Sequence, residues 1–148
     1  MPDQLCESAV SAHADTLIDV LAAQCADLEN LLDLARRERR LAEAGEFDGL
    51  LDVVAQRASL GDRLETYQRQ IAELRRRLGE IPAGDPAAAR AVELANQIRL
   101  EDSGTLLLLT EKRDGLARER ERADGARRNV NAYLRDARAA SVAYDARG

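Results

Sequence analysis

The side chains that most often carry out chemistry are few in this sequence. Its two cysteines, Cys6 and Cys25, lie far apart along the chain, and His13 is the only histidine. Zinc sites usually draw on four closely organised ligands, so these residues predict no metal site. Cys25 falls on an apolar helical stripe and is expected in the core. Cys6 is expected at a frayed end and His13 on an exposed surface.

The acidic pairs and glycine motifs do not indicate catalysis either. Glu101 and Asp102 are adjacent, so on a helix they point in different directions. Gly84, Asp85 and Pro86 are a turn signal and not a glycine-rich phosphate loop. One histidine is also too few for the di-metal sites of helical bundles. We therefore expect a protein that is not an enzyme, with no catalytic residue, no cofactor and no metal.

The composition indicates which elements hold the chain together. Aromatic residues make up 3% of the 148 residues, there is no tryptophan, and 33% of the residues are charged. Alanine, leucine, glutamate and arginine favour helices, whereas the β-branched and aromatic residues typical of strands are scarce. The sequence therefore predicts long helices with a core of leucine and alanine.

The first two helices are predicted over residues 6–44 and 48–78. In the first, larger apolar side chains recur mostly at intervals of three, four or seven residues, which places them on one helical face. Gly45 is expected to end this helix. Because the turn that follows is short, we expect the two helices to be antiparallel neighbours.

The second helix has the clearest periodicity in the chain. A three–four alternation, typical of knobs-into-holes packing, runs along a column that we call the hairpin seam. Its members are Leu50, Val53, Arg57, Leu60, Leu64, Tyr67, Ile71, Leu74 and Leu78. Arg57 interrupts this column, and two explanations stay open. Its stem could lie along the seam with the charge in water, or it could be a paired polar group that fixes the helix register.

A loop over residues 79–85, rich in glycine and proline, precedes a third helix over residues 86–144. Asp85 and Pro86 are a typical N-cap and first-turn pair. Gly104 is a candidate bend point in this helix.

The apolar stripe of the third helix is diluted toward its C-terminal end. Arginines stand at three of its seam positions, Arg113, Arg120 and Arg127. This half of the helix therefore lacks a complete partner within the chain. The whole sequence predicts a single all-α domain over residues 1–148, an elongated antiparallel helical hairpin plus a long third helix, in a three- to four-helix bundle or coiled coil.

The charge distribution argues against several kinds of partner. The net charge is −5, and residues 1–48 carry −7 while residues 86–148 carry +2. Nucleic-acid binding needs a clear basic excess on one face, so we expect no nucleic acid. No apolar run approaches the roughly 20 residues that span a membrane, and the first residues lack a signal-peptide pattern. We expect a cytoplasmic protein without membrane insertion.

The segment from Leu31 to Leu78, LLDLARRERRLAEAGEFDGLLDVVAQRASLGDRLETYQRQIAELRRRL, resembles the FlgN-type flagellar export chaperones. That family typically has a leucine-rich helix, a short turn with Gly or Asp, and then L-x-x-L-x-x-x-K before a second leucine-rich helix. Here the turn is followed by Leu50, by Val53 or Val54, and by Arg57. Arginine thus stands where the family commonly has lysine. The tail, with Tyr144 close to Gly148, also resembles the family's ending.

The resemblance implies a cytoplasmic chaperone that binds helical termini of hook-associated flagellar proteins and delivers them to the type III export gate. It implies that the region from Leu116 to Tyr144 contacts these partners, by pairing with a cargo helix. The partner-binding residues expected there are Leu116, Val130, Tyr133, Leu134, Ala137 and Tyr144.

Other interpretations stay open beside this one. Val130 and Leu134 could pack inside the bundle, and Tyr144 could belong to a disordered tail. The chain could also be a structural coiled-coil adaptor or homo-oligomer in which the hairpin seam pairs between chains. As a chaperone it is expected to be a monomer or a weak homodimer.

Overall fold

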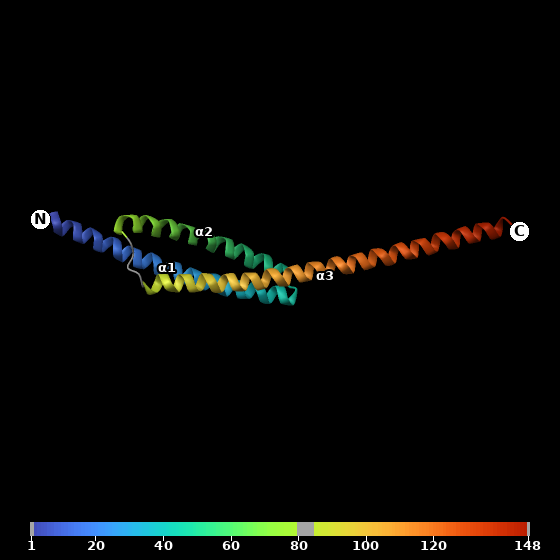
Figure 1. Cartoon of the computed structure of the whole chain (residues 1–148), viewed down its shortest axis with the longest axis horizontal. Helices are drawn as coiled ribbons and strands as arrows, with labels where there is room; N and C mark the ends of the chain where they lie inside the picture. The colour runs from blue at the N-terminus through green and yellow to red at the C-terminus, as the bar shows by residue number, and fades with distance from the viewer. Residues whose placement is uncertain (1, 80–84, 148) are drawn as a thin grey trace. The chain divides into compact units, whose positions relative to one another are not determined.

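Three long α-helices make up the described part of the chain (Figure 1). The structure is a computed structural model that describes residues 2–79 and 85–147, with side chains described from residue 8 onward. α1 spans Pro2–Ala44, α2 spans Phe47–Leu78 and α3 spans Pro86–Asp145. No strand occurs within these described ranges, and the predicted all-α fold is confirmed.

Gly45 ends α1 as its position predicted. Its φ is 76°, in the left-handed region that glycine adopts without steric cost. The amide of Gly45 donates to the carbonyl of Ala42, and the amide of Glu46 donates to the carbonyl of Leu41. This is the Schellman arrangement, which satisfies carbonyls that the end of a helix otherwise leaves free. The chain then reverses directly into α2.

Asp85 begins α3 as the predicted N-cap. Its Oδ1 accepts a hydrogen bond from the amide of Ala87 at 2.9 Å, and Pro86 occupies the first helical position, where its missing N–H costs nothing. Of the predicted loop, residues 80–84 lie outside the described residues.

α3 is helical on both sides of Gly104, and a bend at this residue stays a prediction. Gly104 itself is helical. A Cβ added to Gly104 would lie 3.1 Å from Nη1 of Arg39 on α1. The glycine therefore makes room for an arginine from the neighbouring helix, a contact between residues far apart in the sequence.

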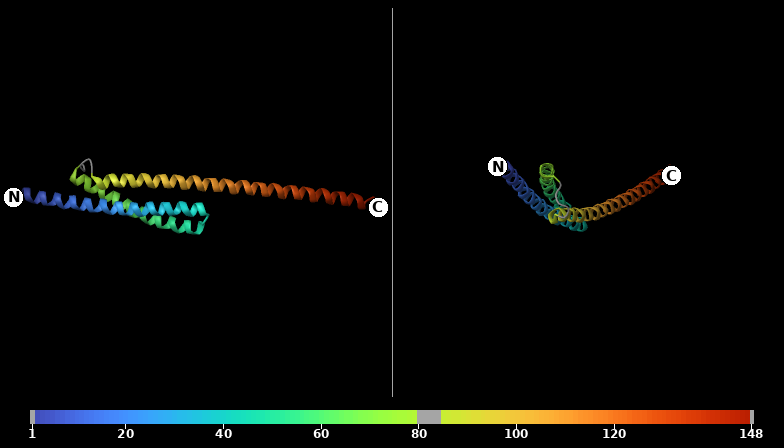
Figure 2. Two further views of the ribbon diagram at one scale, coloured as in Figure 1. Left: turned by 90° about the horizontal axis from the view of Figure 1, so that it is seen from below. Right: turned by 60° about the vertical axis from the view of Figure 1, so that its left-hand side comes forward.

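The chain divides into two compact units, Met1–Leu108 and Leu109–Gly148, which we call unit 1 and unit 2. Unit 1 contains α1, α2 and the N-terminal part of α3, and α1 packs against both other helices. Figure 2 shows α1 and α2 side by side in unit 1. Unit 2 consists of the C-terminal part of α3. A single domain over residues 1–148 stays a prediction.

Two clusters of aliphatic side chains form the core of unit 1. In the first, Leu17 and Leu21 of α1 pack against Ile71 and Leu74 of α2. The second brings all three helices together through Leu28, Leu32, Leu64, Leu94 and Ile98. Burying one such side chain contributes about 1.5–3 kcal/mol, so a narrow core of this kind suffices without large aromatic rings. The pairing order of the clusters is that of an antiparallel hairpin.

Candidate partner-binding surface

The residues expected to bind a partner lie in unit 2 and are exposed. The exposed fractions of their side chains, where given, lie between 49% for Leu134 and 82% for Tyr144. From Leu116 to Arg147 every residue except Gly125 is exposed. Val130 and Leu134 are 57% and 49% exposed, and Tyr144 lies within the helical residues of α3.

Helical geometry brings most of these residues onto one face. Seven residues turn an α-helix through almost two full turns, so positions 116, 123, 130 and 137 form one column. Position 134 lies beside this column. We call the resulting apolar surface the tail stripe; it consists of Leu116, Ala123, Val130, Leu134 and Ala137. Tyr144, seven residues after Ala137, continues this column, whereas Tyr133 lies along one edge of the tail stripe.

A second column, beside the tail stripe, is basic. The tail arginines, Arg113, Arg120 and Arg127, also recur every seven residues and alternate with the tail stripe at intervals of three and four. Arg113 is 3.1 Å from Asp114, its neighbour in the chain. Arg120 and Arg127 form no ion pair in the described part of the structure. Unit 2 as a whole holds ten basic and seven acidic residues, a net charge of +3.

Unit 1 contains an ionic layer around Arg57, whose partners do not follow from the sequence pattern. Nη1 of Arg57 on α2 donates to Oε2 of Glu38 on α1, and Nη2 donates to Oδ2 of Asp102 on α3 at 2.9 Å. The side chains of Arg57 and Glu38 are 19% and 13% exposed, so this pair is largely removed from water. The hydrogen bond with Asp102, reinforced by that with Glu38 and opposed by burial, raises the pKa of Arg57 above its ordinary value.

Arg57 is therefore a paired polar group, the second of the two explanations. The signal that could have found its partner is the hairpin itself. In an antiparallel pair, a residue after the turn lies opposite one at a similar distance before it, and this places Arg57 near Glu38. Glu101 turns toward α1 instead, where its Oε2 accepts a hydrogen bond from Nη1 of Arg39 at 3.3 Å. Glu101 and Asp102 thus point in different directions, as predicted, and bind arginines of α1 and α2 respectively.

The remaining chemically active side chains have local structural partners. The thiol of Cys25 is partly buried and donates to the carbonyl of Ala87 at 3.2 Å, which links α1 to the first turn of α3. Burial, reinforced by the charge of Glu29, raises the pKa of this thiol. His13 was expected on an exposed surface but is partly buried. Its Nδ1 lies 2.6 Å from the carbonyl oxygen of Ala9. The side chain of Cys6 lies outside the described residues.

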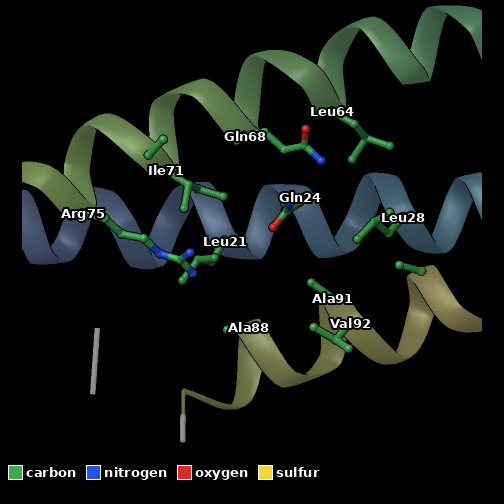
Figure 3. A pocket seen from close by; sticks show the side chains of 12 residues that line it. Leu21, Gln24, Leu28, Leu64, Gln68, Ile71, Arg75, Ala88, Ala91 and Val92 are labelled. Carbon is green, nitrogen blue, oxygen red and sulfur yellow. The ribbon is translucent and has the colours of Figure 1, made fainter. Parts of the chain in front are cut away.

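A shallow groove opens in unit 1 between α2 and α3, with α1 as its floor (Figure 3). Its volume is about 360 Å³. The lining is mainly aliphatic, and Arg75 is the one charged side chain among the described residues that line it. Gln24 and Gln68 add the amide groups. The groove can accept apolar side chains, but it lacks the convergent polar groups of a site built for a small polar ligand.

Comparison with known proteins adds no assignment to this geometry. No protein family, no curated protein and no solved structure matches the chain. None of the helices in the described ranges is long and apolar enough to cross a bilayer. Within residues 2–79 and 85–147, no three histidine, cysteine or acidic side chains are placed to hold a metal ion together.

Proposed function

We propose that this protein is a cytoplasmic binding protein, not an enzyme, and that it acts as an export chaperone of the FlgN type. It would bind a helical terminus of a hook-associated flagellar protein and deliver it to the type III export gate. The observation that carries the proposal is the exposed tail stripe of unit 2. The resemblance of residues 31–78 and of the tail to FlgN-type chaperones supplies the class of cargo.

The tail stripe is suited to reversible pairing with a helix. Most of the stability of a helix in a protein comes from packing of its amphipathic face, and the tail stripe has no packing partner among the described residues. A cargo helix laid on it would bury apolar surface at about 25 cal/mol per Å². The same contact would cover the cargo's own apolar face, and so keep cargo molecules from associating with one another.

The small side chains of the tail stripe limit how tightly cargo is held. Ala123 and Ala137 contribute less buried area than leucine would, while Leu116, Val130 and Leu134 supply the larger contacts. Most affinity differences between related complexes lie in the dissociation rate, so a moderate affinity corresponds to faster release. Faster release suits a chaperone that must give up its cargo at an export gate.

Calorimetric titration with C-terminal peptides of hook-associated proteins tests the proposal. We expect one-to-one binding by the full chain and none by a chain ending at residue 128, whose helicity by circular dichroism should otherwise be retained. Val130→Asp should remove binding, whereas Val142→Asp should not, because Val142 is similarly exposed but lies off the tail stripe. If the truncated chain binds these peptides as well as the full chain does, the proposal fails.

The alternative function, a coiled-coil adaptor paired between chains through the hairpin seam, needs seam residues that are accessible to a second chain. Val53, Leu64, Ile71 and Leu74 are buried against helices of the same chain. Pairing these residues between chains would require unit 1 to open first. We therefore keep the chaperone as the single candidate function.

A further inference from the structure

The tail arginines occupy positions that a pairing helix would cover. They alternate with Leu116, Ala123 and Val130 at the three–four spacing of a knobs-into-holes surface. A helix seated on the tail stripe would therefore contact the stems of these arginines and take part of the water from their guanidinium groups. Removing water from a charge is costly unless an opposite charge replaces it.

Unit 1 shows how this protein satisfies an arginine at such a position. Arg57 stands in the hairpin seam with the same spacing, and carboxylates from two neighbouring helices hold its guanidinium, Glu38 from α1 and Asp102 from α3. In unit 2 the corresponding carboxylates are missing from the described residues: Arg113 contacts only Asp114, next to it in the chain, and Arg120 forms no ion pair. The acidic groups must therefore come from the partner.

A second copy of unit 2 does not supply them. In a parallel pair each tail arginine would meet its own equivalent in the same layer, which is repulsive. In an antiparallel pair each would meet alanine, valine or leucine of the tail stripe and would be desolvated without a counter-charge. Both arrangements leave three arginines unsatisfied in each copy.

The same features favour a protein helix over a membrane or a nucleic acid. The apolar face is built mainly from alanine, valine and leucine, with Tyr144 only at its C-terminal end, so it lacks the Trp and Phe side chains that anchor many helices in a membrane interface. Seven acidic residues stand among the ten basic ones, and a net charge of +3 gives weak attraction to a phosphate backbone.

We propose that the partner of unit 2 is an amphipathic helix that carries acidic residues at seven-residue intervals beside an apolar column. The apolar column would pack on the tail stripe, and three successive carboxylates would pair with Arg113, Arg120 and Arg127. This inference rests on the proposed function and specifies the chemistry of the cargo segment. It makes the tail arginines the residues that select among helices, while the tail stripe supplies contact area.

Designed peptides test the inference directly on the full-length chain. The probes are helical peptides about four heptads long, with leucine in one seam column and glutamate, glutamine or lysine at three successive positions in the other. The chain is compared with the triple variant Arg113→Glu, Arg120→Glu and Arg127→Glu. A matched control carries the same change at three arginines on the opposite side of the helix, Arg118, Arg122 and Arg128. All six arginines are exposed, so both variants keep the core of unit 1.

The glutamate peptide should bind the natural chain about tenfold or more tightly than the glutamine peptide, because three partly desolvated ion pairs form. The tail-arginine variant should reverse this order and prefer the lysine peptide, whereas the control variant should keep the natural preference. Equal binding of the glutamate and glutamine peptides would overturn the inference. So would an equal loss in both variants, or binding of anionic vesicles or single-stranded DNA that depends on the tail arginines.

Peptides from hook-associated proteins separate this inference from the proposed function. If those peptides bind with the same affinity to the natural chain and to the tail-arginine variant, the chaperone function stands and the inference fails. If the glutamate peptide binds through the tail arginines while no hook-associated segment binds, the inference stands and the flagellar function fails. If none of the peptides binds, both are overturned.

Discussion

Arg57 carries a positive charge into a seam that is otherwise almost entirely aliphatic, and two carboxylates hold it there. Glu38 is the more buried partner, with a side chain 13% exposed, while Asp102 is 43% exposed. The layer therefore lies at the border between core and solvent. Breaking a buried ion pair from one side is costly because the remaining charge keeps its desolvation penalty without its partner.

Replacing Arg57 by leucine should destabilise unit 1 even though it extends the aliphatic seam. We expect a loss of about 1–3 kcal/mol in the free energy of unfolding, since Glu38 is left largely buried without its partner. The double variant Arg57→Leu with Glu38→Leu should regain most of this loss. Urea denaturation followed by circular dichroism measures both. Arg69→Leu, at an exposed position of α2, is the control and should change stability little.

Thr105 differs from Arg57 because its buried polar atom has no hydrogen-bond partner in the described structure. Its side chain is 4% exposed, and its Oγ1 has no hydrogen-bond partner in the described structure. Thr105→Val replaces this hydroxyl by a methyl group of similar size, so it should raise the free energy of unfolding by about 1 kcal/mol. Thermal denaturation checks this. Thr66→Val makes the same change at an exposed site whose hydroxyl donates to the carbonyl of Asp62, and should give no gain.

At the scale of the helices, local signals decide how much the sequence could predict. Gly45 and Asp85 act through bonds to residues within a few positions, and for this reason the end of α1 and the start of α3 could be read from the sequence. Gly104 could not be read in this way. Its lack of a side chain serves Arg39 on another helix, and a pattern along one helix contains no information about that contact.

The candidate site also has features that depend on one helix and features that depend on contacts between helices. The tail stripe follows from periodicity alone, because its residues lie within one helix. The family resemblance is what predicts Tyr133 and Tyr144 as partner-binding residues; Tyr144 continues the column of the tail stripe, and Tyr133 lies along its edge. Predicting the carboxylates that pair with Arg57 would require knowledge of the register between the helices. Predicting the groove beside Leu21 and Ile71 would require the angle between α2 and α3. Neither quantity is set by the spacing of residues within a single helix.

Two glycines with open space around their Cα atoms, Gly61 and Gly125, allow the helices of the two units to be compared. A Cβ at Gly61 of α2 would meet nothing within 4 Å, and one at Gly125 of α3 would meet only a flexible arginine at 3.9 Å. Alanine favours a helix over glycine by about 1 kcal/mol at either position. Gly61→Ala should therefore raise the urea midpoint of unit 1. Gly125→Ala should leave that midpoint unchanged and slow amide hydrogen exchange around residue 125.

This comparison depends on the exposure of unit 2. Its side chains from Leu116 onward do not contribute to the core clusters, so opening of its helix is expected to be local. An equal rise of the urea midpoint in both variants would show that the two units unfold together, and would contradict this prediction.

At the scale of the whole molecule, charge is divided between the units. Unit 1 carries a net charge of −8 and unit 2 carries +3. Opposite charges attract copies of the chain weakly at low ionic strength, but at 0.15 M salt the screening length is only about 8 Å. Self-association under physiological conditions therefore depends on apolar contact. Within unit 2 the tail stripe is an exposed apolar surface, and the tail arginines stand beside it.

We therefore expect the natural chain to be a monomer, with the 16.3 kDa mass of one chain in light scattering at 0.15 M salt. Replacing Arg113, Arg120 and Arg127 together by leucine would fuse the tail stripe with a second apolar column. The resulting surface would have the uninterrupted three–four pattern that drives helices to pair, so this variant should form dimers whose proportion rises with concentration.

The same three substitutions at Arg118, Arg122 and Arg128 provide the matched control. They remove equal charge from the same helix but place leucine on the side away from the tail stripe, and they should leave the protein largely monomeric. Dimers in both variants would show that any loss of charge suffices for association. Dimers in the first alone would mean that the tail arginines keep the surface free of other copies and open to a partner with complementary charge.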